Sequence, residues 1–184
     1  MIVIGYQTLE DRDNIDHVEA GGPFPCKRRD AWLSYGCYLW DSNISWAKDW
    51  GEKSFINKGK EYIVGACNID LSKKCFDLFG SVADKEEFMR IVEVLRQSGK
   101  LKPHHRVIVA NIIRFMESKN IFPYKSIRAA DYPSEQRKYF YSVNNERGEY
   151  TIMNQRVQIC VKNKKGVILP SFRVIFPDKY NEQL

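Results

Sequence analysis

Gln7, Tyr38 and Gln158 are side chains of types that can contact a small ligand. Tyr38 lies in an aromatic run, and the face of an aromatic ring suits a flat, electron-poor heterocycle. Gln7 and Gln158 lie in apolar segments, and a glutamine amide can both donate and accept hydrogen bonds. Side chains of these two kinds can contact the flat and the polar parts of a ligand.

Each of these side chains lies on a segment that we expect to be a strand. Apolar and aromatic residues dominate residues 1–8, 32–40 and 156–161, as is typical of strands in a protein core. A short helix is expected over 44–50, because the Asn43 side chain can accept a hydrogen bond from the first free backbone amides. This helix would follow directly on the strand that carries Tyr38.

The rest of the chain indicates an α+β protein with helices in its middle. Asp84 is expected to cap a helix over 85–97, and a second helix is expected over 103–119, because apolar residues recur at helical spacing in both segments. Extended segments are expected over 62–71, 75–78, 121–130, 167–169 and 172–176, and a polar loop over 132–150. Strands that precede and follow a helical middle, rather than alternating with helices, are typical of the α+β class.

The segment around Tyr38 also carries a family resemblance. The strand Gly36–Asn43 and the following helix, with Ala47 and Trp50 spaced three residues apart, resemble the second core motif of the ADP-ribosyltransferase superfamily. The segment is most similar to the compact bacterial branch that shares the His–Tyr–Glu site of poly-ADP-ribose polymerases and diphtheria toxin. In that comparison Tyr38 stands at the tyrosine position of the site.

The two glutamines fall at the other two motif positions. The segment from Gly5 to Thr8 resembles the family's strand that ends in Tyr-His-Gly-Thr, with Gln7 in place of the histidine and Thr8 in place of the glycine. The segment Val157–Val161 resembles the third core strand, with Gln158 at or near the position of the glutamate. The chain therefore departs from the family pattern at two of its three site positions.

The resemblance implies a ligand and a reaction. It implies that NAD is bound and consumed as substrate, with nicotinamide stacked on Tyr38 and with Gln7, Thr8 and Trp46 also contacting NAD. Gln7, Tyr38 and Gln158 would then be the catalytic positions. The implied activity is transfer of ADP-ribose to a macromolecule, or hydrolysis of NAD, by a bacterial toxin that a partner antitoxin protein neutralises.

The resemblance also implies an architecture. It implies a single domain over residues 1–184, with a split, two-sheet β core and a helical pair inserted at about 84–119. Arg128, on the extended segment after that pair, could contact a phosphate of the dinucleotide or form an ion pair with a neighbouring strand.

Two alternatives stay open on the sequence alone. An amide does not ionise near neutral pH, so the glutamines indicate equally a binding or interaction module of the same fold that has lost catalysis. The formal net charge of +6, with lysines and arginines near aromatic residues, is also compatible with a basic nucleic-acid-binding domain. No helix-turn-helix, zinc or glycine-rich aromatic motif supports this last class.

Cysteine usage and hydropathy indicate which cellular compartment, metal binding and membrane association to expect. The chain has five cysteines, an odd number without a C-x-x-C pair, so we expect reduced thiols in a cytoplasmic protein and no structural zinc site. No apolar run approaches the roughly 18 residues that a membrane span requires, and the first residues lack the pattern of a signal peptide. We therefore expect neither a bound metal nor a membrane partner.

Overall fold

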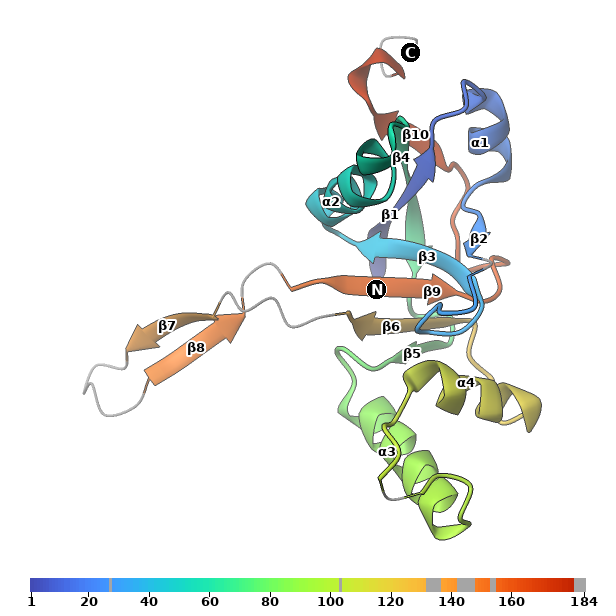
Figure 1. Ribbon diagram of the computed structural model, residues 1–184, viewed down its shortest axis with the longest axis vertical. Helices are drawn as coiled ribbons and strands as arrows, with labels where there is room; N and C mark the ends of the chain where they lie inside the picture. The colour runs from blue at the N-terminus through green and yellow to red at the C-terminus, as the bar shows by residue number, and fades with distance from the viewer. Residues whose placement is uncertain (27, 103, 132–136, 142–147, 153–154, 181–184) are drawn as a thin grey trace.

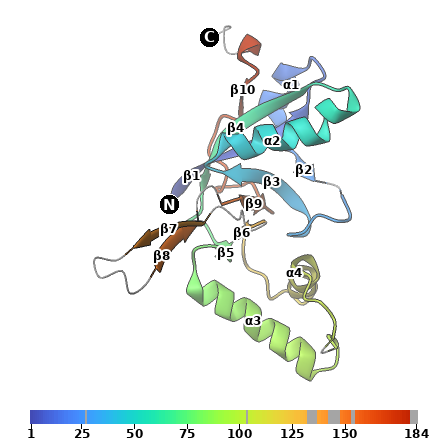
Figure 2. The same ribbon diagram turned by 60° about the vertical axis from the view of Figure 1, so that its left-hand side comes forward.

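The computed structural model describes residues 1–26, 28–102, 104–131, 137–141, 148–152 and 155–180. Its elements confirm the α+β class: a bent sheet carries two helices near one end, and α3 and α4 lie together at the other end, far from β10 (Figures 1 and 2). The helices are α1 (Ile15–Gly21), α2 (Ile44–Ser54), α3 (Val82–Gln97) and α4 (Val109–Ser118). The strands are β1 (Ile2–Glu10), β2 (Pro25–Cys26), β3 (Gly36–Asp41), β4 (Tyr62–Asp70), β5 (Cys75–Asp77), β6 (Ser126–Ala130), β7 (Arg137–Tyr141), β8 (Gly148–Ile152), β9 (Val157–Val161) and β10 (Arg173–Phe176).

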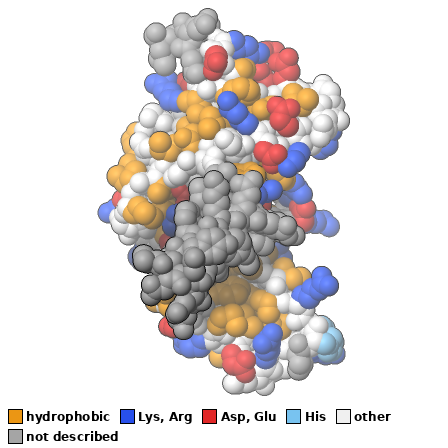
Figure 3. Space-filling model, turned by 90° about the vertical axis from the view of Figure 1, so that its left-hand side faces the viewer, with side chains coloured by type: hydrophobic (Ala, Val, Ile, Leu, Met, Phe, Trp, Pro, Cys, Tyr) orange, Lys and Arg blue, Asp and Glu red, His pale blue; other side chains and the backbone are white. Residues whose placement is uncertain are grey.

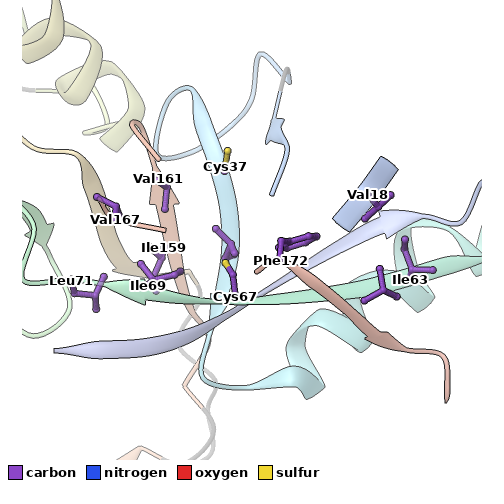
Figure 4. Packing of buried hydrophobic residues seen from close by; sticks show 12 residues of the cluster. Val18, Cys37, Ile63, Cys67, Ile69, Leu71, Ile159, Val161, Val167 and Phe172 are labelled. Carbon is purple, nitrogen blue, oxygen red and sulfur yellow. The ribbon is translucent and has the colours of Figure 1, made fainter. Parts of the chain in front are cut away.

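The main sheet is continuous, and this differs from the two separate sheets expected. Its eight strands run in the order β10-β4-β1-β3-β9-β6-β5, with β2 paired to β3. Strand β1 pairs with β4 along its whole length but with β3 only at Gly5 and Tyr6. Figure 4 shows β3 crossing β1 and β4 at a steep angle. The division between the two halves is therefore a sharp bend in one hydrogen-bonded sheet.

The inside of this bend is filled by apolar side chains from both halves of the sheet. Ile63 and Ile69 of β4 and Ile159 of β9 are fully buried in one cluster, which Phe172 completes from the segment before β10 (Figure 4). Gly36 permits the close pairing of β3 with β9, because a Cβ atom there would lie 2.8 Å from the carbonyl oxygen of Val161. The packing therefore fixes the position of β3, which carries Tyr38.

The helix after β3 begins as predicted. Asn43 caps α2, its side chain accepting a hydrogen bond from the amide of Ser45 at 2.9 Å. Ala47 is fully buried against the sheet, and the helix continues to Ser54, beyond the expected end at residue 50.

The helical middle exists, but its boundaries differ from those expected. Helix α3 starts at Val82 and is capped by Ser81, whose hydroxyl accepts a hydrogen bond from the amide of Asp84; Asp84 itself therefore lies in the first turn. Helix α4 starts only at Val109, because the residues before it are mostly polar and exposed and offer no apolar face to bury. Within the described residues, no helix combines the length and the apolar character needed to cross a membrane.

The prediction of a polar loop over 132–150 is wrong in part. Strands β7 and β8 pair antiparallel and form a separate two-stranded sheet that projects from the main body (Figure 1). The aromatic residues between 139 and 150 favour strands, and that preference prevails over the polar turn signals around them.

Candidate functional site

A cavity of about 540 Å³ opens where β1, β3 and β9 meet α2 and the segment before β3. Its volume falls within the roughly 300–1,000 Å³ that is typical of small-molecule sites. Gln7, Tyr38 and Gln158 all line it, from the three strands that lie side by side in the sheet. The side chains singled out in the sequence are thus brought together in one place.

The walls of the cavity are mainly aromatic, with a few charged groups. The aromatic residues that line it are Phe24, Trp32, Tyr38, Trp40, Trp50 and Phe55. The charged residues that line it are Arg28, Asp30, Lys58 and Asp131. A site of this composition suits a ligand with a flat ring and both positive and negative charges.

Gln7 is held by backbone groups on every side. Its Nε2 donates to the carbonyl oxygens of Phe24 at 2.8 Å and of Tyr38 at 3.2 Å, and its Oε1 accepts from the amide of Phe24 at 2.7 Å. The side chain is buried and ties the segment around Phe24 to the sheet. Both donor hydrogens are in use, so Gln7 shapes the cavity wall and has no donor left for a ligand.

Tyr38 has a structural role through its hydroxyl and also contributes to the cavity wall. Its hydroxyl donates to the carbonyl oxygen of Ser34 at 2.7 Å and accepts from the amide of Leu33 at 2.8 Å, which fixes the turn before β3. Burial, the largest cause, raises the pKa of the Tyr38 phenol far above its usual range, so the hydroxyl stays protonated. The residue also lines the cavity, and its partly buried side chain packs against the apolar cluster that contains Leu33 and Cys160.

Gln158 is held at one end only. Its Oε1 accepts a hydrogen bond from the indole Nε1 of Trp32 at 2.7 Å, which orients the amide. Its Nε2 makes no hydrogen bond to any described residue, and the side chain is half-buried in the cavity wall. Gln158 therefore presents an oriented donor to a ligand.

Thr8 and Trp46, the other two residues that the resemblance placed in contact with NAD, have mainly packing roles. Thr8 lines the cavity, but its hydroxyl donates to the carbonyl oxygen of Ala47 at 2.6 Å and anchors α2 to β1. Trp46 packs in a cluster with Trp40 and Ala47 and is not among the described residues that line the cavity. Trp50, one turn later on α2, occupies the place expected for Trp46.

A carboxylate that the sequence analysis missed lies near Gln158. Asp131 lines the cavity, and its Oδ2 accepts from Nη2 of Arg156 at 2.8 Å. The Arg156 guanidinium lies 5.1 Å from the ring centroid of Trp40 and 5.2 Å from that of Trp46, so two indoles hold it in place. The other oxygen of Asp131 has no hydrogen-bond partner among the described residues. No sequence motif surrounds Asp131, which follows β6, so little in the sequence indicates that it belongs to the site.

The second carboxylate of the cavity is differently placed. Asp30 is exposed, and Arg28 donates to both its oxygens, from Nε at 2.9 Å and from Nη2 at 2.5 Å. This pair lies at the mouth of the cavity, where the guanidinium also lies 5.9 Å from the ring centroid of Trp50. Of the two carboxylates, Asp131 is thus the more buried and the less fully paired.

Arg128 forms ion pairs with neighbouring strands. Its Nε donates to Asp41 at 2.7 Å and its Nη1 to Asp77 at 3.2 Å, which joins β3, β5 and β6. The Asp41 side chain is 3% exposed, so this interaction is protected from solvent and tightens the sheet beside the site. Of the two partners considered from the sequence, the structure shows the strand carboxylates.

Among the described residues that line the cavity, Cys26 is the one cysteine. All five cysteines are free, and burial raises the pKa of Cys160, beside Tyr38 on β9, to about 12. That thiol is therefore protonated at neutral pH and is not a nucleophile. Within the described residues, no group of three or more His, Cys, Asp or Glu side chains is arranged to hold a metal ion.

Comparisons of the chain with protein-family models, with curated proteins and with solved structures find no match. The family resemblance therefore depends on the motif residues in the sequence alone.

Proposed function

We propose that this cavity binds NAD and that the protein acts on it as an ADP-ribosyltransferase or NAD glycohydrolase. The observation that supports the proposal most is that the three motif positions meet in one cavity. Three motif positions far apart in the sequence, Gln7, Tyr38 and Gln158, line one aromatic cavity on three adjacent strands. The resemblance marks these three positions, and their spacing in the sequence does not require them to meet.

The cavity offers a partner for each part of the dinucleotide. The electron-poor nicotinamide ring would stack on Tyr38, with Trp50 and Trp32 completing an apolar slot. The free Nε2 of Gln158 would donate to a ribose hydroxyl or to the carboxamide oxygen. The cations Arg28 and Lys58 at the cavity wall would attract the pyrophosphate.

The reaction requires few groups from the protein. The bond between ribose C1′ and the nicotinamide nitrogen breaks, and its electron pair leaves with nicotinamide; the acceptor's lone pair then forms the new bond to C1′, and the acceptor loses a proton. Gln158 cannot take up that proton near neutral pH. Asp131 is the carboxylate placed to receive it and to stabilise the positive charge that develops on the ribose.

A second candidate function is a binding module that holds NAD without cleaving it. The saturation of Gln7 by backbone groups favours this candidate, because Gln7 stands at the family's histidine position and has no donor left to orient a ribose. Gln158→Glu separates the two candidates. If the enzyme lacks only a second carboxylate, this variant should release nicotinamide faster than the wild type by about tenfold or more. Expression should then also arrest growth.

The primary test is a calorimetric titration with NAD on two matched variants of α2. Trp50→Ala removes a ring that lines the cavity, whereas Trp46→Ala removes an equally large ring from the packing behind it. We expect Trp50→Ala to weaken NAD binding by about 1–3 kcal/mol, the range of aromatic stacking on bases, and Trp46→Ala to leave the affinity of the folded protein unchanged. Absence of saturable NAD binding by the wild-type protein would refute the proposal.

A further inference from the structure

A second hollow lies at the other end of the molecule, between the end of α3 and the start of α4. It has a volume of about 550 Å³ and is separate from the cavity at β3 in the residues that line it. Its floor is apolar: Leu95 and Ile112 are buried there, and Phe115 is partly buried. Ile108 lies at its edge with 54% of its surface exposed and adds an apolar side chain beside this floor.

Lys100 and Arg106 give the rim of this groove two positive charges. Lys100, His104, His105 and Arg106 line it and are exposed, and none of the described residues that line it is an aspartate or glutamate. Figure 3 shows histidine side chains at the edge of this helical end of the molecule, close to lysine or arginine side chains. An apolar floor with a basic rim is the pattern of a surface that binds an acidic partner.

We propose that this groove binds an acidic peptide segment of a partner protein, with an apolar side chain of the segment on the floor and its carboxylates against the rim. Desolvation of Ile108 and Phe115 would supply affinity, and the lysine and arginine would supply orientation and fast association. The proposal does not depend on NAD binding, because the two cavities share no residue.

The arrangement favours a peptide over a nucleic acid. Single-stranded nucleic acids bind on exposed aromatic faces, where bases stack. Phe115 is the only Phe, Tyr or Trp ring among the described residues that line the groove, and Lys100 lies over it, with Nζ 5.3 Å from the ring centroid. The exposed imidazoles of His104 and His105 face each other edge to face, with their centroids 4.6 Å apart, rather than forming a continuous stacking platform. A branched aliphatic side chain fits this floor better than a flat base.

Fluorescence anisotropy with a labelled peptide that alternates glutamate and leucine tests the proposal. We expect saturable binding that weakens about tenfold or more in the charge-reversed variant Lys100→Glu/Arg106→Glu. Lys73→Glu/Lys85→Glu reverses two exposed lysines that do not line the groove, and it should keep the wild-type affinity. Peptides with glutamine for glutamate, or alanine for leucine, should each bind more weakly than the parent peptide.

Three results would overturn the proposal. The first is no saturable binding of the parent peptide to the wild-type protein. The second is an equal loss of affinity in both charge-reversed variants, which would indicate attraction by net charge alone. The third is tighter binding of a single-stranded oligonucleotide than of the peptide, abolished by Lys100→Glu/Arg106→Glu, which would assign the groove to nucleic acid. Circular dichroism of each variant ensures that only folded proteins are compared.

Discussion

The two walls of the cavity at β3 carry the same residue type in opposite situations. On the β1 wall, Gln7 is buried and its amide is fully bonded to the backbone of Phe24 and Tyr38. On the β9 wall, Gln158 is half-buried and accepts a hydrogen bond from Trp32, and its Nε2 has no partner among the residues that the structure describes. A motif position therefore predicts where a side chain lies but not whether it is available to a ligand.

The difference arises from what lies opposite each glutamine. The segment around Phe24 folds back over β1, and its backbone groups need partners because they are removed from water. Among the described residues, no backbone group bonds to the Gln158 side chain, which lines the cavity. We therefore assign the β1 wall to stability and propose the β9 wall for binding, and each assignment can be tested by its own substitution.

Removal of the Gln7 side chain should have the largest effect on stability. Gln7→Ala deletes three hydrogen bonds and leaves the amide and carbonyl of Phe24 without these partners, so we expect the free energy of unfolding to fall by about 2–4 kcal/mol. Urea denaturation measures the change. Gln158→Ala is the matched control and should cost less than about 1 kcal/mol of stability. Equal losses in the two variants would contradict the contrast between the walls.

The reverse order is expected for ligand affinity. Gln158→Ala removes the free donor of the β9 wall, so NAD should bind about 1 kcal/mol more weakly, the net value of one hydrogen bond. The free energy of unfolding should hardly change. Calorimetric titration measures the affinity. If Gln158→Ala binds NAD as tightly as the wild type, Nε2 does not contact the ligand.

The effect expected to be smallest near neutral pH, where it vanishes, concerns the hydroxyl of Tyr38. Burial raises the pKa of this phenol, whereas in the unfolded chain it ionises near its ordinary pKa of about 10. The unfolded state therefore loses this proton first as the pH rises, and the free energy of unfolding should fall above about pH 10, by at most about 1.4 kcal/mol per pH unit for this phenol. Below that pH the contribution is fully present.

Tyr38→Phe isolates the contribution. The variant lacks the phenol, so its stability should decline less steeply between about pH 10 and 11 than that of the wild type. Burial, and then the hydrogen bond to Glu52, raise the pKa of Tyr62 to about 12. Tyr62 is present in both proteins, so it contributes equally to the pH dependence of their stability. Identical slopes for the two proteins would show that the Tyr38 hydroxyl is not protected by the fold.

Local patterns in the sequence predicted the elements around the site well. The aromatic run before Asn43 predicted β3, and the Asn43 side chain predicted the start of α2. The start of α3 was also readable, because Ser81 and Asp84 have the spacing of a capping box, although the cap was assigned to the wrong residue. These features depend on neighbours in the chain, which a sequence displays directly.

Long-range contacts were beyond such patterns. The saturation of Gln7 depends on the return of Phe24, and the oriented amide of Gln158 depends on Trp32, which lies 126 positions away. Asp131 lines the site because it follows β6, which pairs with β9. Trp50 lines it because α2 packs beside β3. None of these contacts follows from periodicity or from a motif, so the hydrogen bonding of the site could be described only from the structure.

A crystal structure of the protein with NAD tests the central claim most directly. The account predicts the nicotinamide ring stacked on the ring of Tyr38, with Nε2 of Gln158 within hydrogen-bond distance of the ribose or the carboxamide and with Gln7 still bonded to Phe24. NAD bound elsewhere on the protein, or a cavity without NAD at concentrations that saturate binding in solution, would contradict it.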